Sequence, residues 1–374
     1  MQDLSKAAGL KAALLDRISR GTGAPIGDAE FGALALAVFA HQYAGNEPYR
    51  MFCDRRGASP STVSHWMEVP AVPTDAFKAA ALVVGGAGAA ARTFRTSGTT
   101  AGAERRGVHH LPDLDLYDAA LRAGFAAHLL PDGARPRIVS LVPARDGMPE
   151  SSLSHMIGEV MADAGGRGGW FVDPQGGIAH GGLSAALRDA ERMGEPVLIP
   201  GTAFAFVHWL DALRERGESF RLPAGSRVMD TGGFKGRSRE VTREELYAGF
   251  AERLGIGPAW CVNEYGMTEM SSQFYDTVAG RGGADVDPGA RRYQGPPWVR
   301  TQATDPETLR PLPDGEVGVL RHWDLANLNS VMAIQTADLG ITSPDGFRLL
   351  GRATGAEARG CSIAMDELLS AIRR

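Results

Sequence analysis

From about residue 93 onward, short apolar runs alternate with segments of helical periodicity, and this alternation constrains the fold more than any other feature. Buried strands are expected at 137–142, 196–200 and 226–230, and helices at 154–164, 203–216 and 242–254. Strands separated by helices form parallel sheets whose faces the helices cover. The sequence therefore predicts an α/β fold with a largely parallel sheet.

The chain is expected to divide into four consecutive parts. Residues 1–92 are predicted to be mainly helical and to belong to the same domain as the α/β core at 93–288. Shorter strands expected at 317–323, 331–335 and 347–350 indicate a smaller β-rich subdomain over 289–350. Residues 351–374 then form a short C-terminal tail, with a short helix expected at 364–372.

Composition excludes several classes of protein. The net charge of −5 provides no general attraction to nucleic acid. Three widely spaced cysteines form neither a metal-ligand pattern nor a disulfide framework, which suits a reducing compartment. The N-terminal segment has the pattern of an amphipathic helix rather than a signal peptide, and no apolar run reaches membrane-spanning length. The expected location is therefore the cytoplasm.

The strongest local signal is the glycine- and hydroxyl-rich segment TSGTTAG. It contains Thr96, Ser97, Gly98, Thr99, Thr100 and Gly102. Glycines let a backbone approach an anion, and amides and hydroxyls donate to phosphate oxygens. No lysine follows the second glycine, so this is not the common GxxxxGK[ST] phosphate loop. The segment alone is compatible either with a phosphate-binding loop or with a polar surface loop.

Two later segments carry complementary chemistry. NEYGMTE at 263–269 follows an expected strand at 259–262 and offers an aromatic ring for a purine, a hydroxyl for phosphate and carboxylates for Mg²⁺. TADLG at 336–340 offers an acidic side chain suited to ribose hydroxyls. Each segment on its own is equally compatible with an ordinary strand end or turn.

Together and in this order, the three segments resemble the adenylate-forming superfamily, which includes acyl-CoA synthetases, adenylation domains and luciferases. The chain is more narrowly similar to the acyl-protein synthetase (LuxE) family, through VPTDAFK at 72–78, TGGFKGR at 231–237 and GRATGAEARGCS at 351–362. The resemblance implies the large N-terminal domain of that fold, with parallel sheets flanked by helices, a nucleotide-binding core at 93–288 and a β-rich subdomain. It also implies that the mobile C-terminal domain of longer relatives is truncated here, because only a short tail follows Arg352.

The resemblance implies ATP and Mg²⁺ as cofactors and assigns the motif residues to them. Phosphate contacts are implied for the TSGTTAG loop, and contacts along the adenine and acyl pocket for Gly232 and Gly233. Tyr265 and Gly266 would lie beside adenine, Thr268 at the α-phosphate, and Glu269 on Mg²⁺. Asp338 would hold the ribose hydroxyls, and Arg352 would contact ribose or phosphate.

The cation that assists the first reaction is left open by the sequence. Longer relatives have a lysine shortly after the phosphate loop, where this chain has Arg105 and Arg106, and they take a second lysine from the C-terminal domain. Lys78 and Lys235 are candidates for that role, and each is equally compatible with a solvated surface lysine. His155 stands where the superfamily often places an aromatic ring or a histidine beside the reacting carboxylate, although a lone histidine on a helix is more often structural.

The acceptor of the acyl group is the second open question. Cys361 matches the position at which the LuxE family forms a thioester, and its place before a helix and beside Arg359 predicts a lowered thiol pKa. A small buried structural cysteine is the alternative. The resemblance leaves coenzyme A, a carrier protein or an amine as other acceptors of the activated carboxylic acid, and an acyl-reductase protein as a partner. A catalytically degenerate nucleotide-binding scaffold is the alternative from a different class.

Overall fold

The computed structural model describes residues 4–96, 106–232, 241–281, 287–353 and 359–372, and these form two compact units that are discontinuous in sequence. Unit 1 contains Met1–Gly124, Met267–Gln273 and Gln294–Arg374, and unit 2 contains Phe125–Gly266 and Phe274–Tyr293. The N-terminal helices and the β-rich region near 300–350 thus belong to one unit, whereas the sequence suggested four consecutive parts.

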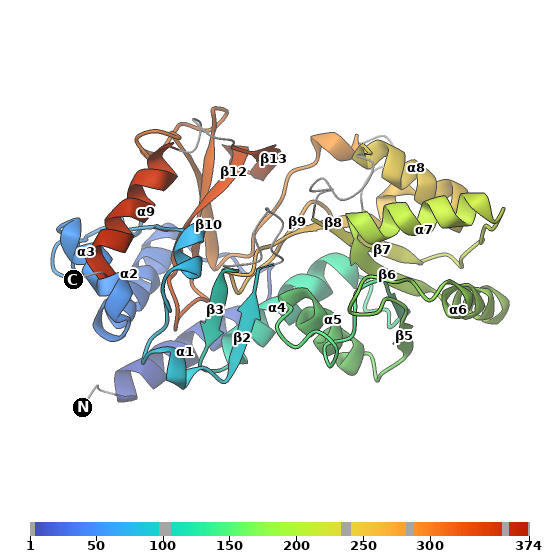
Figure 1. Ribbon diagram of the computed structural model, residues 1–374, viewed down its shortest axis with the longest axis horizontal. Helices are drawn as coiled ribbons and strands as arrows, with labels where there is room; N and C mark the ends of the chain where they lie inside the picture. The colour runs from blue at the N-terminus through green and yellow to red at the C-terminus, as the bar shows by residue number, and fades with distance from the viewer. Residues whose placement is uncertain (1–3, 97–105, 233–240, 282–286, 354–358, 373–374) are drawn as a thin grey trace. The chain divides into compact units, whose positions relative to one another are not determined.

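Unit 2 is built around a six-stranded sheet in the order β5-β4-β6-β7-β8-β9 (Figure 1). Its strands are β4 (Arg137–Ser140), β5 (Gly168–Trp170), β6 (Val197–Thr202), β7 (Arg227–Thr231), β8 (Cys261–Tyr265) and β9 (Phe274–Tyr275). All neighbours pair in parallel except β8 and β9. The prediction of an α/β fold with a largely parallel sheet is confirmed.

Four helices connect the parallel strands of unit 2. They are α5 (Ser152–Asp163), α6 (His180–Met193), α7 (Ala203–Glu215) and α8 (Arg243–Leu254). Because right-handed crossovers are the rule, this strand order places α6, α7 and α8 on one face of the sheet and α5 on the other. Local sequence sets the helix starts: Ser151, Thr202 and Thr242 each accept a backbone N–H with their side chains.

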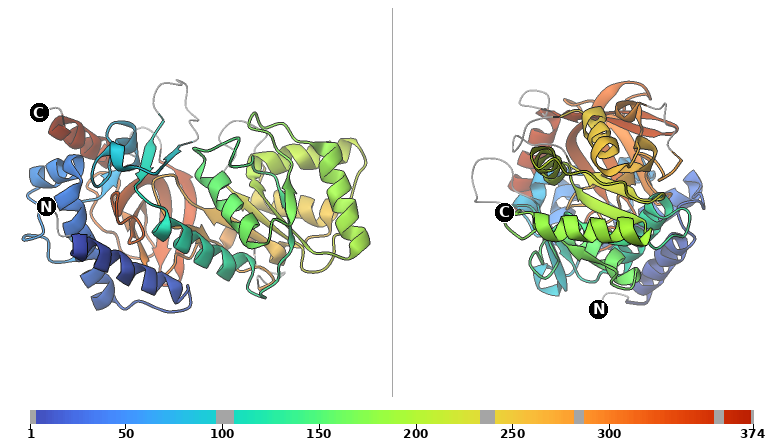
Figure 2. Two further views of the ribbon diagram at one scale, coloured as in Figure 1. Left: turned by 90° about the horizontal axis from the view of Figure 1, so that it is seen from below. Right: turned by 90° about the vertical axis from the view of Figure 1, so that its right-hand side faces the viewer.

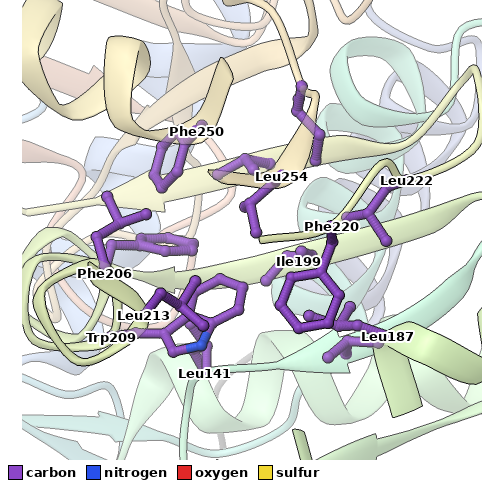
Figure 3. Packing of buried hydrophobic residues seen from close by; sticks show 14 of the residues in the cluster. Leu141, Leu187, Ile199, Phe206, Trp209, Leu213, Phe220, Leu222, Phe250 and Leu254 are labelled. Atoms are coloured by element: carbon purple, nitrogen blue, oxygen red, sulfur yellow. The ribbon is translucent and has the colours of Figure 1, made fainter. Parts of the chain in front are cut away.

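The face covered by α6, α7 and α8 holds the core shown in Figure 3. Phe206 and Trp209 of α7 pack there with Phe250 of α8, and the rings of Phe206 and Phe250 meet edge to face at 4.8 Å. Ile199 of β6 and Leu141, just after β4, contribute from the sheet. The short apolar runs of the sequence are therefore apolar because parallel strands are buried on both faces.

Unit 1 contains a five-stranded sheet in the order β1-β12-β11-β10, with β13 also paired to β12. Its strands are β1 (Val72–Pro73), β10 (Val299–Thr304), β11 (Val317–Asp324), β12 (Ala333–Ser343) and β13 (Gly346–Arg352). A separate hairpin pairs β2 (Arg92–Arg95) with β3 (Val108–Leu111). The strands expected in the β-rich region are therefore present, with β12 extending well beyond its predicted end.

Helices complete unit 1 at both ends of the chain. They are α1 (Leu4–Ser19), α2 (Asp28–Gly45), α3 (Glu47–Arg55) and α9 (Arg359–Ile372), with a short 3-10 helix η2 (Thr74–Lys78) after β1 and α4 (Asp115–Leu129) leading into unit 2. Helix α9 packs beside α3 and against η2, β1 and β12 (Figure 2). In the described ranges, no helix combines the length and apolarity required to span a bilayer.

Candidate active site

The stem of the TSGTTAG segment lies in unit 1, between β2 and β3. Thr96 closes this stem: its N–H donates to the carbonyl of Gly107 at 3.0 Å, and its hydroxyl accepts from the Gly107 N–H at 2.9 Å. Arg106 is exposed and donates from Nε to the Thr96 carbonyl. The predicted phosphate-binding residues Ser97, Gly98, Thr99, Thr100 and Gly102 lie outside the described residues, as does Arg105.

Thr268 and Glu269 stand directly beside this stem. A Cβ atom built on Gly107 would lie 3.5 Å from Oε1 of Glu269, so the glycine leaves room for the carboxylate to approach the backbone. Glu269 is only 6% exposed, and burial raises the pKa of its carboxyl to about 7, with the positive charge of Arg352 acting in the opposite direction. The acidic end of the NEYGMTE motif is therefore a desolvated carboxylate at the base of the predicted phosphate loop.

His109 on β3 fixes the backbone of the same motif. Its Nδ1 lies 2.8 Å from the carbonyl oxygen of Thr268, and because a carbonyl only accepts, Nδ1 carries the proton. Burial lowers the pKa of His109 to about 4, so the ring is neutral at physiological pH. The ring also meets Phe77 edge to face at 5.8 Å. One neutral imidazole thus ties β3, the strand that follows the TSGTTAG segment, to Thr268.

A β-bulge shapes the TADLG motif. Where β12 pairs with β11, three residues from Thr336 to Asp338 lie opposite the single residue Leu320. Bulges of this kind bend a strand and re-aim side chains, and they are frequent next to active sites. Asp338 is paired across the sheet with Arg352, whose Nε lies 3.2 Å from Oδ1 of Asp338. The predicted ribose carboxylate and the predicted GR arginine therefore do come together.

Cys361 contacts the same strand from the first turn of α9. Its Sγ lies 3.4 Å from the carbonyl oxygen of Thr336, two residues before Asp338. The expectation of a lowered thiol pKa was wrong: burial raises the pKa of Cys361 and outweighs the opposing charge of Arg321. Helix α9 also begins at Arg359, earlier than the predicted start, so Cys361 lies within the helix and not before it.

The other cysteines are fully buried. Cys53 lies in α3 and Cys261 in β8, and burial raises the pKa of both thiols, that of Cys53 to about 12. Cys361 is the partly exposed one of the three. A reagent or acyl donor therefore reaches Cys361 first.

The sequence also predicted catalytic roles for Lys78, Lys235 and His155. Lys78 ends η2 and forms an ion pair with Asp75 at 2.6 Å, so its charge is already balanced in this arrangement. Lys235 lies outside the described residues. His155 belongs to unit 2, where it is buried in the first turn of α5 and follows the Ser151 cap.

Unit 2 carries the remaining motif residues at the carboxyl ends of β7 and β8, the edge of a parallel sheet where ligands usually bind. Tyr265 ends β8, with its ring 5.7 Å from that of Phe274, and Gly266 follows it. Gly232 follows β7 with a φ of 75°, a conformation that favours glycine. Gly233 lies outside the described residues.

Glu264 is one of the two carboxylates of NEYGMTE, and the sequence assigned it no role of its own. It is 5% exposed, accepts a hydrogen bond from the Thr231 hydroxyl, and has its pKa raised to about 7 by burial. On the opposite face of β8, Asn263 donates to Asp230, and Tyr247 donates to the same carboxylate at 2.8 Å. Side chains of a strand alternate between its two faces, so Glu264 and Tyr265 point to opposite faces of β8. This alternation is the sequence signal that separates Glu264 from the aromatic residue beside it.

His109 was also missed. It stands in the run Val108–Leu111, where the burial pattern alternates and makes His109 an inward position of β3. Nothing local in the sequence identifies its partner, since the Thr268 carbonyl belongs to a distant segment. An inward histidine shortly after a phosphate-loop motif was the only hint.

Comparisons with known proteins identify the fold. A crystal structure of 2-hydroxyisobutyryl-CoA ligase in complex with 2-HIB-AMP and CoA superimposes with a TM-score of 0.60 at 17% identity, over 89% of this chain and 78% of that one. ATP-bound MatB from Rhodopseudomonas palustris gives 0.50 at 16% identity, over 70% of this chain. This chain spans only 47% of the length of that MatB chain. The fold is therefore that of the adenylate-forming enzymes.

Sequence comparison is more specific. The family model "Acyl-protein synthetase, LuxE" matches residues 183–370, and the curated Long-chain-fatty-acid--luciferin-component ligase of Vibrio harveyi is 22% identical over 90% of this chain and 88% of its own length. The chain belongs to the acyl-protein synthetase (LuxE) family. It is accordingly a ligase that activates acids through an adenylate, as the resemblance of its motifs predicted.

Proposed function

We propose that this enzyme activates a carboxylic acid with ATP to give an acyl-adenylate and then transfers the acyl group to the thiol of Cys361. The observation that supports the second half is the position of Cys361 in α9, where its sulfur lies against β12. Its sulfur contacts Thr336, in the same bulge that presents Asp338 and Arg352. The thiol therefore contacts a residue that lies only two positions before Asp338, the proposed ribose-binding carboxylate. This position is suited to reaction with an adenylate.

The roles of the motif residues complete this proposal. The TSGTTAG segment, Thr96–Gly102, would bind the phosphates of ATP, and Thr268 would contact the α-phosphate. His109 would hold Thr268 in register with the loop stem through the Thr268 carbonyl. Asp338 would accept hydrogen bonds from the ribose hydroxyls, with Arg352 beside it.

Glu269 is suited to holding Mg²⁺. An oxygen ligand of this kind matches the preference of the ion, and a buried carboxylate with a pKa near 7 regains its charged form when a cation binds it. The close approach that Gly107 permits leaves the carboxylate beside the stem of the phosphate loop. When bound, the ion would neutralise phosphate charge; Glu269 and Asp338 then keep it and the ribose in fixed positions.

The chemistry follows in two displacements. In the first, a carboxylate oxygen of the acid attacks the α-phosphorus of ATP, the bond to the β-phosphate oxygen breaks, and pyrophosphate leaves with the electron pair. In the second, the Cys361 thiol gives its proton to solvent, and the sulfur attacks the acyl carbon. The carbon–oxygen bond to AMP then breaks, so AMP leaves and a thioester remains.

The first half is tested by pyrophosphate release with a panel of acids. Long-chain fatty acids are the first choice, because the Vibrio harveyi relative is named for that substrate. We expect release that requires both ATP and one class of acid. No release with fatty, aromatic or amino acids would favour a nucleotide-binding scaffold instead.

The second half is tested by intact-mass analysis after incubation with ATP and the active acid. The wild type and Cys53→Ala should gain one acyl group, and Cys361→Ala should gain none while still releasing pyrophosphate. Cys53 is the matched control because it is a fully buried thiol in the same unit. Equal acyl adducts on the Cys361→Ala and wild-type proteins would refute the proposal. If the wild type and Cys361→Ala both acylate added coenzyme A or carrier protein, the acceptor is external.

A further inference from the structure

Arg321 is a cation that the reaction described above does not yet use. It lies on β11, partly buried, opposite Gln335 of β12. Its Nε donates to Oε1 of Gln335 at 2.8 Å, and its Nη2 donates to the carbonyl of Leu309 at 3.0 Å. Both partners are neutral, and within the described part of the chain no ion pair joins Arg321 to a carboxylate. Its positive charge is therefore not balanced by its own hydrogen bonds.

Arg321 and the start of the helix that carries Cys361 share two neighbours, strand β12 and the turn after β10. Gln335 binds Arg321 and the adjacent Thr336 contacts Cys361, so the two side chains meet neighbouring residues of one strand. The hairpin turn after β10 connects them a second time. Its Leu309 carbonyl accepts from Arg321, and its Pro306 carbonyl accepts from the N–H of Gly360 at 2.8 Å.

This turn is tightly constructed. Leu309 has a φ of 57°, in the left-handed region that costs a non-glycine residue about 1–2 kcal/mol, and its N–H donates to the Asp305 carbonyl at 2.8 Å. A Cβ on Gly360 would lie 2.8 Å from Cγ of Leu309, so only glycine permits the close approach of α9. Strain of this kind persists where the surrounding structure demands it, and here it fixes a carbonyl on Arg321 and the start of the helix that carries Cys361.

We propose that Arg321 is the cation that serves the acyl-transfer step, by stabilising the Cys361 thiolate and then the oxyanion formed at the acyl carbonyl. The inference rests on the proposed function, in which Cys361 is the acyl acceptor. As the sulfur bonds to the acyl carbon, the carbonyl electron pair moves to oxygen, and this charge returns to the carbon when AMP leaves. A guanidinium that is held in place by neutral partners needs no reorganisation to stabilise such charge.

The electrostatics of the neighbourhood agree with this role. Burial raises the pKa of the Cys361 thiol, and Arg321 is the group that opposes the rise, whereas Asp75 on η2 adds to it. Burial also lowers the pKa of Arg321 to about 10, with the positive charge of Arg56 acting in the same direction. Arg321 is therefore a desolvated cation that a nearby negative charge stabilises, and a thiolate or oxyanion supplies such a charge.

The experiment measures the alkylation rate of Cys361 by iodoacetamide against pH, in the full chain without ATP or acid, with the labelled peptide quantified by mass spectrometry. We expect Arg321→Gln to move the midpoint of the profile upward by about one pH unit, and to slow alkylation about tenfold below the midpoint. Arg321→Lys should restore most of the rate because it keeps the charge. Arg310→Gln is the matched control, since Arg310 is an exposed arginine of the same turn, and should leave the profile unchanged.

Removing a desolvated charge and leaving neutral partners is compatible with folding, and Arg321→Met provides the same comparison should the glutamine variant melt below the assay temperature. Coincident profiles for the wild type and either neutral variant would overturn the proposal. So would an equal shift in Arg310→Gln. In the acylation assay, the neutral variants should release pyrophosphate normally but acylate Cys361 more slowly. The alkylation profile remains informative even if Cys361→Ala shows that the acyl group goes elsewhere, so the two ideas fail separately.

Discussion

Glu264 makes the stability of unit 2 depend on pH, and the direction can be worked out from its surroundings. The carboxyl is buried at the end of β8, accepts one hydrogen bond from Thr231, and within the described residues has no ion pair with a cation. Burial is the largest cause of its raised pKa, and the negative charge of Asp230 adds to it. The folded pKa is about 7, against an ordinary value of 4.5.

A raised carboxyl pKa stabilises the fold at low pH. Below about pH 4.5 both the folded and the unfolded chain carry the proton; between there and pH 7 only the folded chain keeps it. The contribution is therefore fully present below pH 4.5 and is lost as pH rises through 7. A difference of about two and a half pH units corresponds to about 3 kcal/mol of unfolding free energy.

The substitution Glu264→Gln isolates this contribution, because the amide oxygen can still accept from Thr231 but cannot ionise. We expect the unfolding free energy of the variant, relative to wild type, to rise by about 2.5 kcal/mol between pH 5 and pH 8.5 in urea denaturation, since part of the contribution is already lost at pH 5. Glu215→Gln, an exposed glutamate of α7, is the control and should show no such change. A relative stability of Glu264→Gln that is the same at both pH values would refute the reasoning.

Substitutions at three further positions in unit 1 have defined outcomes. Gly360→Ala places a Cβ 2.7 Å from the Pro306 carbonyl and should destabilise the docking of α9 by about 1–3 kcal/mol, measured as faster hydrogen exchange in that helix. Asp324→Ala removes the acceptor of the buried Ser271 and Ser272 amides and should lower the unfolding free energy by about 3 kcal/mol in thermal or urea denaturation. His109→Phe should raise the KM for ATP severalfold while His109→Asn, which keeps a donor, should not; equal KM values would contradict the positioning role.

The parallel sheet of unit 2 was predictable because its strands are buried on both faces. Such strands appear in sequence as apolar runs, and the runs near residues 138 and 198 became β4 and β6 within a few residues of their expected bounds. Helix starts were also close, because the hydroxyl caps at Ser151, Thr202 and Thr242 are local signals.

Pairing between distant segments could not be predicted. Strand β1 contributes two residues, Val72 and Pro73, which pair in parallel with Ile334 and Gln335 of β12. Two residues contain no periodicity, and their partner lies in a segment joined to them only through the folded chain. For this reason the N-terminal region and the β-rich region were expected as separate parts, although the structure places them in one unit.

The motif side chains proposed for the site could be named from the sequence, whereas the residues that contact their backbones could not. Asp338 and Arg352 were identified from motifs, and the structure pairs them across adjacent strands. His109 binds the backbone carbonyl of Thr268, and Arg321 binds the Leu309 carbonyl and the side-chain amide of Gln335. Contacts of this kind cannot be inferred from the residue types of a motif. The thiol pKa of Cys361 was predicted in the wrong direction because sequence shows a neighbouring charge but not the burial that outweighs it.

The bulge in β12 links the residues that we propose for the two half-reactions. Because Thr336 to Asp338 oppose only Leu320, the strand turns within three residues from the Cys361 contact to the Arg352 contact, and the Thr336 hydroxyl donates to the Leu320 carbonyl at 2.8 Å to hold that turn. Regular pairing would have put Thr336 and Asp338 on one face at a strand's ordinary spacing. A change that straightens the bulge would therefore displace the proposed ribose carboxylate and the thiol contact together. The two steps should lose activity in parallel there, whereas substitutions at Arg321 should affect only the second.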